Sequence, residues 1–96
     1  KIYEDEYVLS FNDINPQAPI HILIIPKKEI PQLSLSDDND SELLGKLLIA
    51  ANKIAEDHDT KDALRIVINN GAKAGQSVFH LHLHLLAGRP LSWPPG

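Results

Sequence analysis

Three histidines alternate with leucines in the segment Val78–Leu86, whose sequence is Val-Phe-His-Leu-His-Leu-His-Leu-Leu. In an extended strand, His80, His82 and His84 share one face, with neighbouring rings about 6.5 Å apart. Imidazole titrates near neutral pH and serves as a nucleophile, a general acid or base, or a metal ligand. The pattern therefore predicts a strand with one chemically active face and one apolar face.

Two other interpretations of this histidine row stay open. It could be the polar face of an ordinary half-buried strand, although the row uses three of the five histidines in the chain. It could also bind a metal, because His-x-His on a strand brings two ring nitrogens to one ion. The chain has no cysteine, and His21 is the only other histidine in a strand-like context. The third and fourth ligands that zinc usually takes are therefore scarce.

Length and charge narrow the class of protein. A chain of 96 residues forms one small domain, which gains stability from a partner. The net charge is −4 and the basic residues are scattered, so a nucleic-acid polymer is not expected as a partner. The absence of cysteine excludes disulfides and cysteine-based zinc sites.

No segment of the sequence is expected to enter a membrane. The longest apolar run, Ile22–Ile25, is too short to cross a bilayer, and no charged and apolar leader opens the chain. We expect a cytoplasmic protein, with the nucleus as a second compartment. Because the chain does not begin with Met, we expect a preceding N-terminal extension, which leaves organelle targeting open.

The hydropathy pattern predicts five strands and one main amphipathic helix, an α+β domain with an antiparallel sheet. The strand after the proline-rich loop is apolar on both faces and should be central. The helix should pack its apolar stripe on the sheet. The expected strands are Ile2–Tyr3, Tyr7–Phe11, His21–Pro26, Leu64–Asn69 and Val78–Leu86, and the helix runs from about Asp38 to about Asp57.

Two irregular segments flank the histidine row. The loop Asn70–Ser77 contains two glycines, which let the backbone approach a ligand and expose N–H groups, although an ordinary hairpin loop would look the same. The proline-rich tail Leu91–Gly96 cannot form a ladder or a helix. Its Trp93 must therefore pack on its own domain or on a neighbour.

The segment Gln76–Leu86 resembles the signature of the histidine triad (HIT) family. Further segments resemble the Hint branch, the histidine triad nucleotide-binding proteins, and the Trp-Pro-Pro-Gly ending distinguishes this branch from the dinucleoside-polyphosphate hydrolases of the Fhit branch. One departure is Ala87, where a glycine is usual. The Hint-like segments are Phe11–His21, Ile24–Lys27, Ile68–Gly71, Gly88–Arg89 and Trp93–Gly96.

The resemblance implies a single HIT domain over residues 1–96 with the HIT-like fold. It implies a homodimer whose two five-stranded sheets join into one, with a purine mononucleotide site on each subunit. It also implies a phosphoramidase, which hydrolyses AMP-type phosphoramidates to the nucleoside monophosphate and an amine through a nucleotidyl-histidine intermediate. That chemistry requires no cofactor, and zinc is not needed.

By the same resemblance, His82 is the nucleophile and His84 handles the phosphate and the proton. His80 and His21 orient these two rings, a role compatible with a core histidine at position 21. Asp13 would accept the ribose hydroxyls, although it could simply cap a turn. Ser77 supplies a catalytic hydroxyl. The nucleotide-binding residues implied are Phe11, Asp13, Ile14, Leu23, Asn69, Gly75, Gln76, Ser77, Val78 and Trp93.

Two other functions remain compatible with these residues. The same site could hydrolyse dinucleoside polyphosphates or nucleotidyl sulfates, because the nucleophile and the phosphate contacts would be shared. The protein could instead be a nucleotide-binding regulatory or scaffold protein. Trapping a nucleotidylated His82 separates an enzyme from a scaffold.

Overall fold

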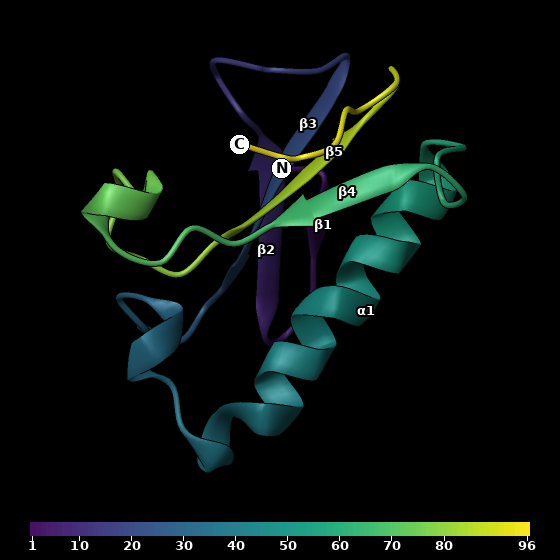
Figure 1. Cartoon of the computed structure of the whole chain (residues 1–96). Coiled ribbons are helices and arrows are strands. Elements are labelled where there is room, and N and C mark those ends of the chain that lie inside the picture. The colour runs from purple at the N-terminus through teal and green to yellow at the C-terminus, as the bar shows by residue number, and fades with distance from the viewer.

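A computed structural model describes all residues of the chain, 1–96. One antiparallel sheet of five strands carries a single long helix on one face (Figure 1), in the strand order β1-β2-β3-β5-β4. This confirms the predicted α+β fold. The strands are β1 (Tyr3–Glu4), β2 (Val8–Asn12), β3 (Ile20–Pro26), β4 (Leu64–Val67) and β5 (Leu83–Ala87), the helix is α1 (Ser41–Asp57), and the short 3-10 turns are η1 (Leu33–Leu35), η2 (Asp38–Asp40) and η3 (Ala72–Ala74).

The alternation of side chains along β3 and β5 creates two different sheet faces. Ile22 and Ile24 of β3 and Leu83 and Leu85 of β5 are buried in the main core cluster. Because β3 lies between β2 and β5, it is the central strand, as its apolar character predicts. The residues between these core positions point to the opposite face of the sheet.

The helix α1 covers only the core face of the sheet. Its buried stripe combines large and small side chains, and the alanines allow a close approach to the strands. The predicted start near Asp38 is wrong by about one turn, because Asp38–Asp40 forms the 3-10 turn η2. The Asp37 side chain accepts the Asn39 N–H in a capping box. The buried helix residues are Leu47, Ala50, Ala51, Ile54 and Ala55.

The predicted strand Val78–Leu86 is wrong at its first half. The ladder with β3 begins only at Leu83, paired with Ile24, and ends at Ala87. The preceding residues form an irregular segment, tied to the rest of the fold by a bond from the Leu81 N–H to the Ile30 carbonyl at 2.7 Å. Hydrogen bonds outside the ladder therefore position the first two histidines.

Two further boundaries differ from the prediction. The strand β4 ends at Val67, two residues before the predicted end at Asn69. The first hairpin is shifted by one residue, with β1 at Tyr3–Glu4 and β2 starting at Val8. None of the helices combines the length and the apolar composition that crossing a bilayer requires.

Candidate active site

His21 and His84 meet on the sheet face that α1 leaves open. In the register of β3 and β5, Leu86 lies opposite His21 and Leu23 lies opposite His84, so the two histidines are diagonal neighbours. His21 Nε2 lies 2.9 Å from His84 Nδ1, and the ring centroids are 5.2 Å apart. The predicted contact between His21 and the histidine row is therefore present.

The hydrogen bond between the His21 and His84 rings has a defined donor and a defined acceptor. The main-chain N–H of Gln17 donates to His21 Nδ1 at 3.0 Å, so Nδ1 is an acceptor. A neutral His21 then carries its proton on Nε2 and donates it to His84 Nδ1. His84 in turn must carry its own proton on Nε2. The network thus fixes His84 as a hydrogen-bond donor toward the open face.

In a neutral His82 the proton is on the other ring nitrogen, Nδ1. Its Nδ1 lies 2.7 Å from the main-chain carbonyl oxygen of His80, and because a carbonyl only accepts, His82 Nδ1 carries the proton. The lone pair of a neutral His82 is therefore on Nε2. His80 anchors this segment, since its Nε2–H donates to the Pro26 carbonyl at the end of β3 at 2.8 Å.

His82 and His84, which carry their protons on different ring nitrogens, are neighbours. The ring centroids of His82 and His84 are 5.0 Å apart, with an interplanar angle of 64°. A ring with a lone pair on Nε2 and a ring with an N–H donor are thus neighbours, and each is held by a hydrogen bond at its Nδ1. This arrangement suits attack on an electrophilic centre whose oxygens or leaving group accept a hydrogen bond.

His84 is held in its neutral form. Burial lowers the pKa of His84 below its ordinary value, and repulsion from the positive forms of His82 and His21 lowers it further. The carboxylate of Asp13 opposes this shift. A second proton on Nδ1 would also face the Nε2–H of His21. His84 therefore acts near neutral pH as a donor from Nε2.

Asp13 lies immediately after β2 beside His21. Its N–H donates to the His21 carbonyl at 3.0 Å, and its Oδ1 accepts the Asn15 N–H at 2.8 Å. Its other oxygen, Oδ2, is 3.5 Å from His21 Nε2. Asp13 thus caps a turn, one of its two predicted roles, while Oδ2 stays without a close donor.

The ligand atoms of Asp13, His21 and His84 all lie within 4.8 Å of one another. Two imidazoles and a carboxylate are a donor set that zinc takes. However, His21 and His84 already share a proton over 2.9 Å, and every buried side-chain polar atom has a hydrogen-bond partner. An ion at this cluster would have to displace the shared proton, so zinc and the proton bridge exclude each other.

The loop Asn70–Ser77 exposes fewer free backbone N–H groups than the sequence predicts. Gly71 and Gly75 have φ of 91° and 105°, as glycine allows. The N–H groups of Gly75 and Gln76 bond to the carbonyls of Ala72 and Gly71, at 3.0 and 3.1 Å. They are therefore not free to hold a phosphate. The N–H of the exposed Ser77 has no acceptor within the chain.

Gln76 has a structural side chain. It is 3% exposed, its Oε1 accepts the Gly71 N–H at 2.8 Å, and its Nε2 donates to the carbonyls of Pro31 and Val78. With its own N–H also occupied, no donor of Gln76 remains for a nucleotide, and the predicted direct contact is corrected to a positioning role. Asn69 lies against this loop, since a Cβ added to Gly75 would be 3.6 Å from Asn69 Nδ2.

The predicted base-pocket residues fall into two groups. Phe11 and Leu23 lie opposite each other on β2 and β3, half-buried on the open face, and Leu23 borders His84. Ile14 and Val78 are exposed, at 102% and 62%. The structure therefore joins only Phe11 and Leu23 into one apolar surface beside the histidines.

The tail carries Trp93 away from the domain. Arg65 of β4 donates from Nη2 to the Ser92 carbonyl at 2.8 Å, yet the next side chain, Trp93, is 81% exposed. Of the two alternatives drawn from the sequence, packing on its own domain is thus wrong. The Trp93 side chain is free to contact another molecule.

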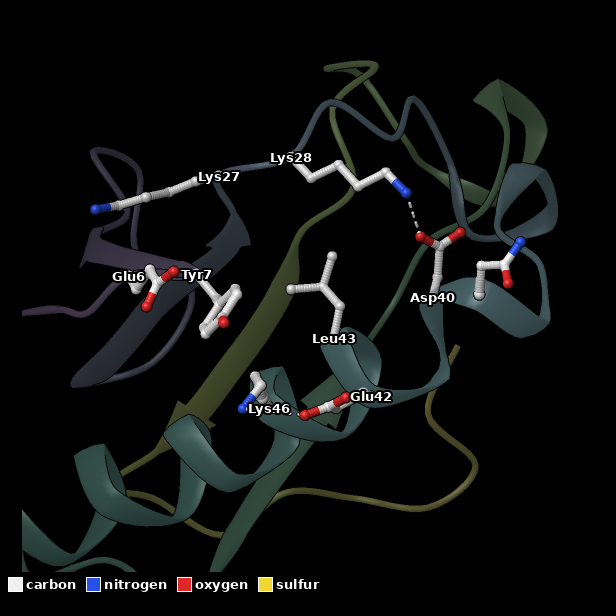
Figure 2. A pocket seen from close by; sticks show the side chains of 9 residues that line it. Glu6, Tyr7, Lys27, Lys28, Asp40, Glu42, Leu43 and Lys46 are labelled. Atoms are coloured by element: carbon white, nitrogen blue, oxygen red, sulfur yellow. Dashed lines mark hydrogen bonds and ion pairs between the residues drawn. The ribbon is translucent and has the colours of Figure 1, made fainter.

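Away from the histidines, a cavity of about 390 Å³ lies where Tyr7 and Lys28 approach the start of α1 (Figure 2). Its cations are paired: Lys28 is 2.6 Å from the buried Asp40, and Lys46 is 3.7 Å from Glu42 and stacks over the Tyr7 ring. Lys28 lowers the pKa of Asp40. Lys27, the third cation of the cavity, pairs with Glu4 at 2.6 Å, so the ion pairs leave no unpaired cation there for an anionic ligand.

Sequence reasoning missed the main-chain partners that set the protonation of the rings. The Gln17 N–H and the carbonyls of Pro26 and His80 bond to three of the four histidines. Every residue type supplies a carbonyl and every type except proline an N–H, so no side-chain motif marks these groups. Only the proline-rich composition of the Asn15–Pro19 loop hints that its main chain is held rigidly.

Comparison with known proteins places this site in one family. A profile of the HIT domain matches residues 1–91. An uncharacterised HIT-like protein of Synechocystis is 59% identical over 95 residues, covering 99% of this chain and 83% of that protein. A 14 kDa zinc-binding protein of Zea mays is 50% identical over 97 residues, covering 99% and 76%.

Solved structures give the same result. A HIT family hydrolase from Legionella pneumophila superposes with a TM-score of 0.97 at 49% identity, over 99% of this chain and 86% of that chain. A histidine triad nucleotide-binding protein from Candida albicans superposes with a TM-score of 0.79 at 30% identity, over 96% and 71%.

Proposed function

Because the chain belongs to the HIT domain family, we propose that it is a purine nucleoside phosphoramidase. It cleaves the P–N bond of an AMP-type phosphoramidate and releases the nucleoside monophosphate and an amine. The observation that carries this proposal is that His82 and His84, with ring centroids 5.0 Å apart, have hydrogen-bond partners that place the proton of a neutral His82 on Nδ1 and that of a neutral His84 on Nε2. Related hydrolases and nucleotide-binding proteins supply the reaction class and the ligand class.

In the first step, His82 Nε2 attacks the α-phosphorus in line with the leaving amine. The new N–P bond makes the His82 ring a cation, and its Nδ1–H then donates more strongly to the His80 carbonyl, now 2.7 Å away. That bond stabilises the charge as it develops. The His80 carbonyl is itself held in place, because the His80 ring bonds to Pro26 at the end of β3.

His84 assists at the phosphoryl group. Its Nε2–H faces the open side of the sheet and donates a hydrogen bond to a phosphoryl oxygen, while the leaving nitrogen takes its proton from solvent as the P–N bond breaks. The free N–H and the hydroxyl of Ser77 supply further donors. In the second step, water attacks phosphorus and gives up a proton to solvent, and His82 leaves as a neutral imidazole.

The nucleoside would lie on the open face of the sheet. Phe11 and Leu23 offer an apolar surface for the base beside His84, and Asp13 Oδ2 has no close donor, so it is available for the ribose hydroxyls. We place Ile14, Val78 and Asn69 at the margin of this site.

We also propose that the protein acts as a homodimer. The strand β4 is at the edge of the sheet and pairs only with β5. A second copy could add its own β4 there and join the two sheets. Trp93, exposed at 81%, would then be available to the partner. Sedimentation or light scattering measures this state.

The decisive experiment is to trap the intermediate. The purified protein is mixed with an adenosine phosphoramidate and quenched within one turnover, and peptide mass spectrometry then locates the added nucleotidyl group. We expect it on His82, and we expect the His82→Ala variant to lose turnover while it still binds AMP. A label on another residue, or full turnover by His82→Ala, would refute the nucleophile assignment. A parallel panel of dinucleoside polyphosphates and nucleotidyl sulfates identifies the preferred leaving group.

A further inference from the structure

The side chain of Arg89 bonds to the main chain of the loop that controls His21. Its Nε and Nη2 donate to the Gln17 carbonyl at 3.3 and 2.9 Å, and its Nη1 donates to the Pro90 carbonyl at 3.0 Å. Arg89 makes no ion pair with a carboxylate, although it is exposed. Its bonds therefore hold the backbone and do not balance a charge.

The residue before Arg89 packs tightly on the same loop. Gly88 has φ of 93°, and a Cβ added there would lie 2.9 Å from Pro19 Cβ and 3.5 Å from the Ile20 nitrogen. Such a contact is closer than real Cβ atoms allow. The turn after β5 and the Asn15–Pro19 loop are thus fitted to each other at two adjacent positions, by close packing at Gly88 and by hydrogen bonds at Arg89.

The loop contacts the histidines through one main-chain N–H group, that of Gln17. Gln17 offers its carbonyl to Arg89 and its N–H to His21 Nδ1, while its side chain bonds only to the Asn15 carbonyl. His21 Nε2 then donates to His84 Nδ1 at 2.9 Å. A continuous chain of contacts therefore runs from Arg89 through Gln17 and His21 to His84.

We propose that Arg89 is a positioning residue for the His21–His84 pair, because it holds the Gln17 main chain where the Gln17 N–H keeps the His21 proton on Nε2. Without that N–H, His21 Nδ1 is free to carry the proton, and Nε2 then becomes an acceptor. His84 Nδ1 loses its donor, and the proton of His84 distributes between both nitrogens. The fraction of protein with His84 Nε2–H facing the substrate falls.

NMR of the imidazole nitrogens reports these tautomers directly, without substrate. In the unaltered protein above the histidine pKa values, we expect His21 and His84 each to show one tautomer, with the proton on Nε2. In Arg89→Ala we expect both rings to show mixed tautomers. Arg89→Lys should lie between them, because an ammonium group cannot reproduce the planar fork of the guanidinium. Arg65→Ala, which removes a comparable bond to the Ser92 carbonyl, should leave both tautomers unchanged.

Gln17 provides a matched pair of variants that act downstream of Arg89. Gln17→Pro deletes the N–H, whereas Gln17→Ala keeps it and removes only the side chain. We expect mixed tautomers in the proline variant and one tautomer in the alanine variant. Adding Arg89→Ala to Gln17→Pro should change the tautomers no further, because both substitutions remove the same donor. If Arg89→Ala fails to fold, the Gln17 pair and Arg89→Lys decide the question.

The kinetic part of the test rests on the proposed function, and the NMR part does not. For an AMP-type phosphoramidate, we expect Arg89→Ala to lower kcat about fivefold, the factor of one ordinary hydrogen bond, with KM changed less than about twofold. A single tautomer in Arg89→Ala, or fully additive effects with Gln17→Pro, would overturn the inference. Mixed tautomers in a protein that hydrolyses no phosphoramidate would instead refute the proposed function alone.

Discussion

The bond between His21 and His84 is the contact whose removal tests the site most directly. His21→Leu deletes the Nε2–H that donates to His84 Nδ1 over 2.9 Å. An acceptor left without a partner in a half-buried position costs about 1–3 kcal/mol. If that free energy is lost from the reacting arrangement, kcat falls by about fivefold to 150-fold. Substrate binding should change less, because His21 is 6% exposed and lies behind His84.

The same substitution should change the pH dependence of the reaction. The pKa of His84 lies below its ordinary value through burial and through repulsion by His82 and His21, against the attraction of Asp13. Activity that needs neutral His84 is therefore retained as the pH falls to about 6.5 and is lost below it. Removing His21 removes one cause of the lowering, so the pKa of His84 rises. The acid limb of the kcat profile should then move to higher pH.

A matched variant separates hydrogen bonding from packing. His21→Gln offers an amide N–H to His84 Nδ1, whereas His21→Leu fills a similar space without a donor. We expect the glutamine variant to recover part of the loss in kcat measured with an adenosine phosphoramidate, with both variants checked by thermal unfolding. If the leucine variant keeps the kcat and the acid limb of the unaltered protein, the assignment of His21 as the donor to His84 is wrong.

Three further predictions follow from the same contacts. Exhaustive chelation should leave kcat unchanged, and added zinc should inhibit by displacing the proton shared by His21 and His84; a loss of activity that zinc restores would contradict this. Deleting Leu91–Gly96 should alter the preference among leaving groups more than the melting temperature, because Trp93 is 81% exposed; unfolding of the truncated chain would refute it. Finally, the folded protein should lose stability on acidification below about pH 6.5, because the lowered pKa of His84 means that the unfolded chain binds this proton more tightly. Unfolding curves at several pH values, with His84→Gln as the control, measure that contribution.

The sequence predicted the parts of the fold that depend on periodicity. The apolar character of β3 identified the central strand, and the three- and four-residue spacing of apolar residues identified α1. It failed at Val78–His82, where a period of two predicted a strand. Val78 and Phe79 are both exposed, and burial alternates only over His80–His82, with Leu81 buried between two half-buried histidines, yet no neighbouring strand pairs with these residues. Alternation reports which side chains face the core, and hydrogen bonding decides whether the backbone forms a ladder.

Prediction of the site was also limited, because the sequence does not show which backbone and side-chain groups are already hydrogen-bonded. Side-chain identity marked the histidines, Asp13 and Ser77, but it gave Gln76 a ligand contact that its buried amide cannot make. The loop donors were also misplaced, because local bonds within a turn occupy the N–H groups of Gly75 and Gln76. A glycine-rich sequence shows where a backbone can bend, and only the completed turn shows which N–H groups stay free.

The different tautomers of the histidines arise from these main-chain partners. A carbonyl beside His82 Nδ1 can only accept, so a neutral His82 keeps its lone pair on Nε2. The N–H beside His21 Nδ1 can only donate, so His21 donates to His84 and a neutral His84 keeps its proton on Nε2. The irregular backbone of Val78–His82 leaves the His80 carbonyl free to accept from the His82 ring. In a regular ladder this carbonyl would pair with a neighbouring strand or point away from the ring. Substitutions that move Pro26, Gln17 or the turn at Gly88 should therefore impair catalysis even though no side chain at these positions contacts the substrate.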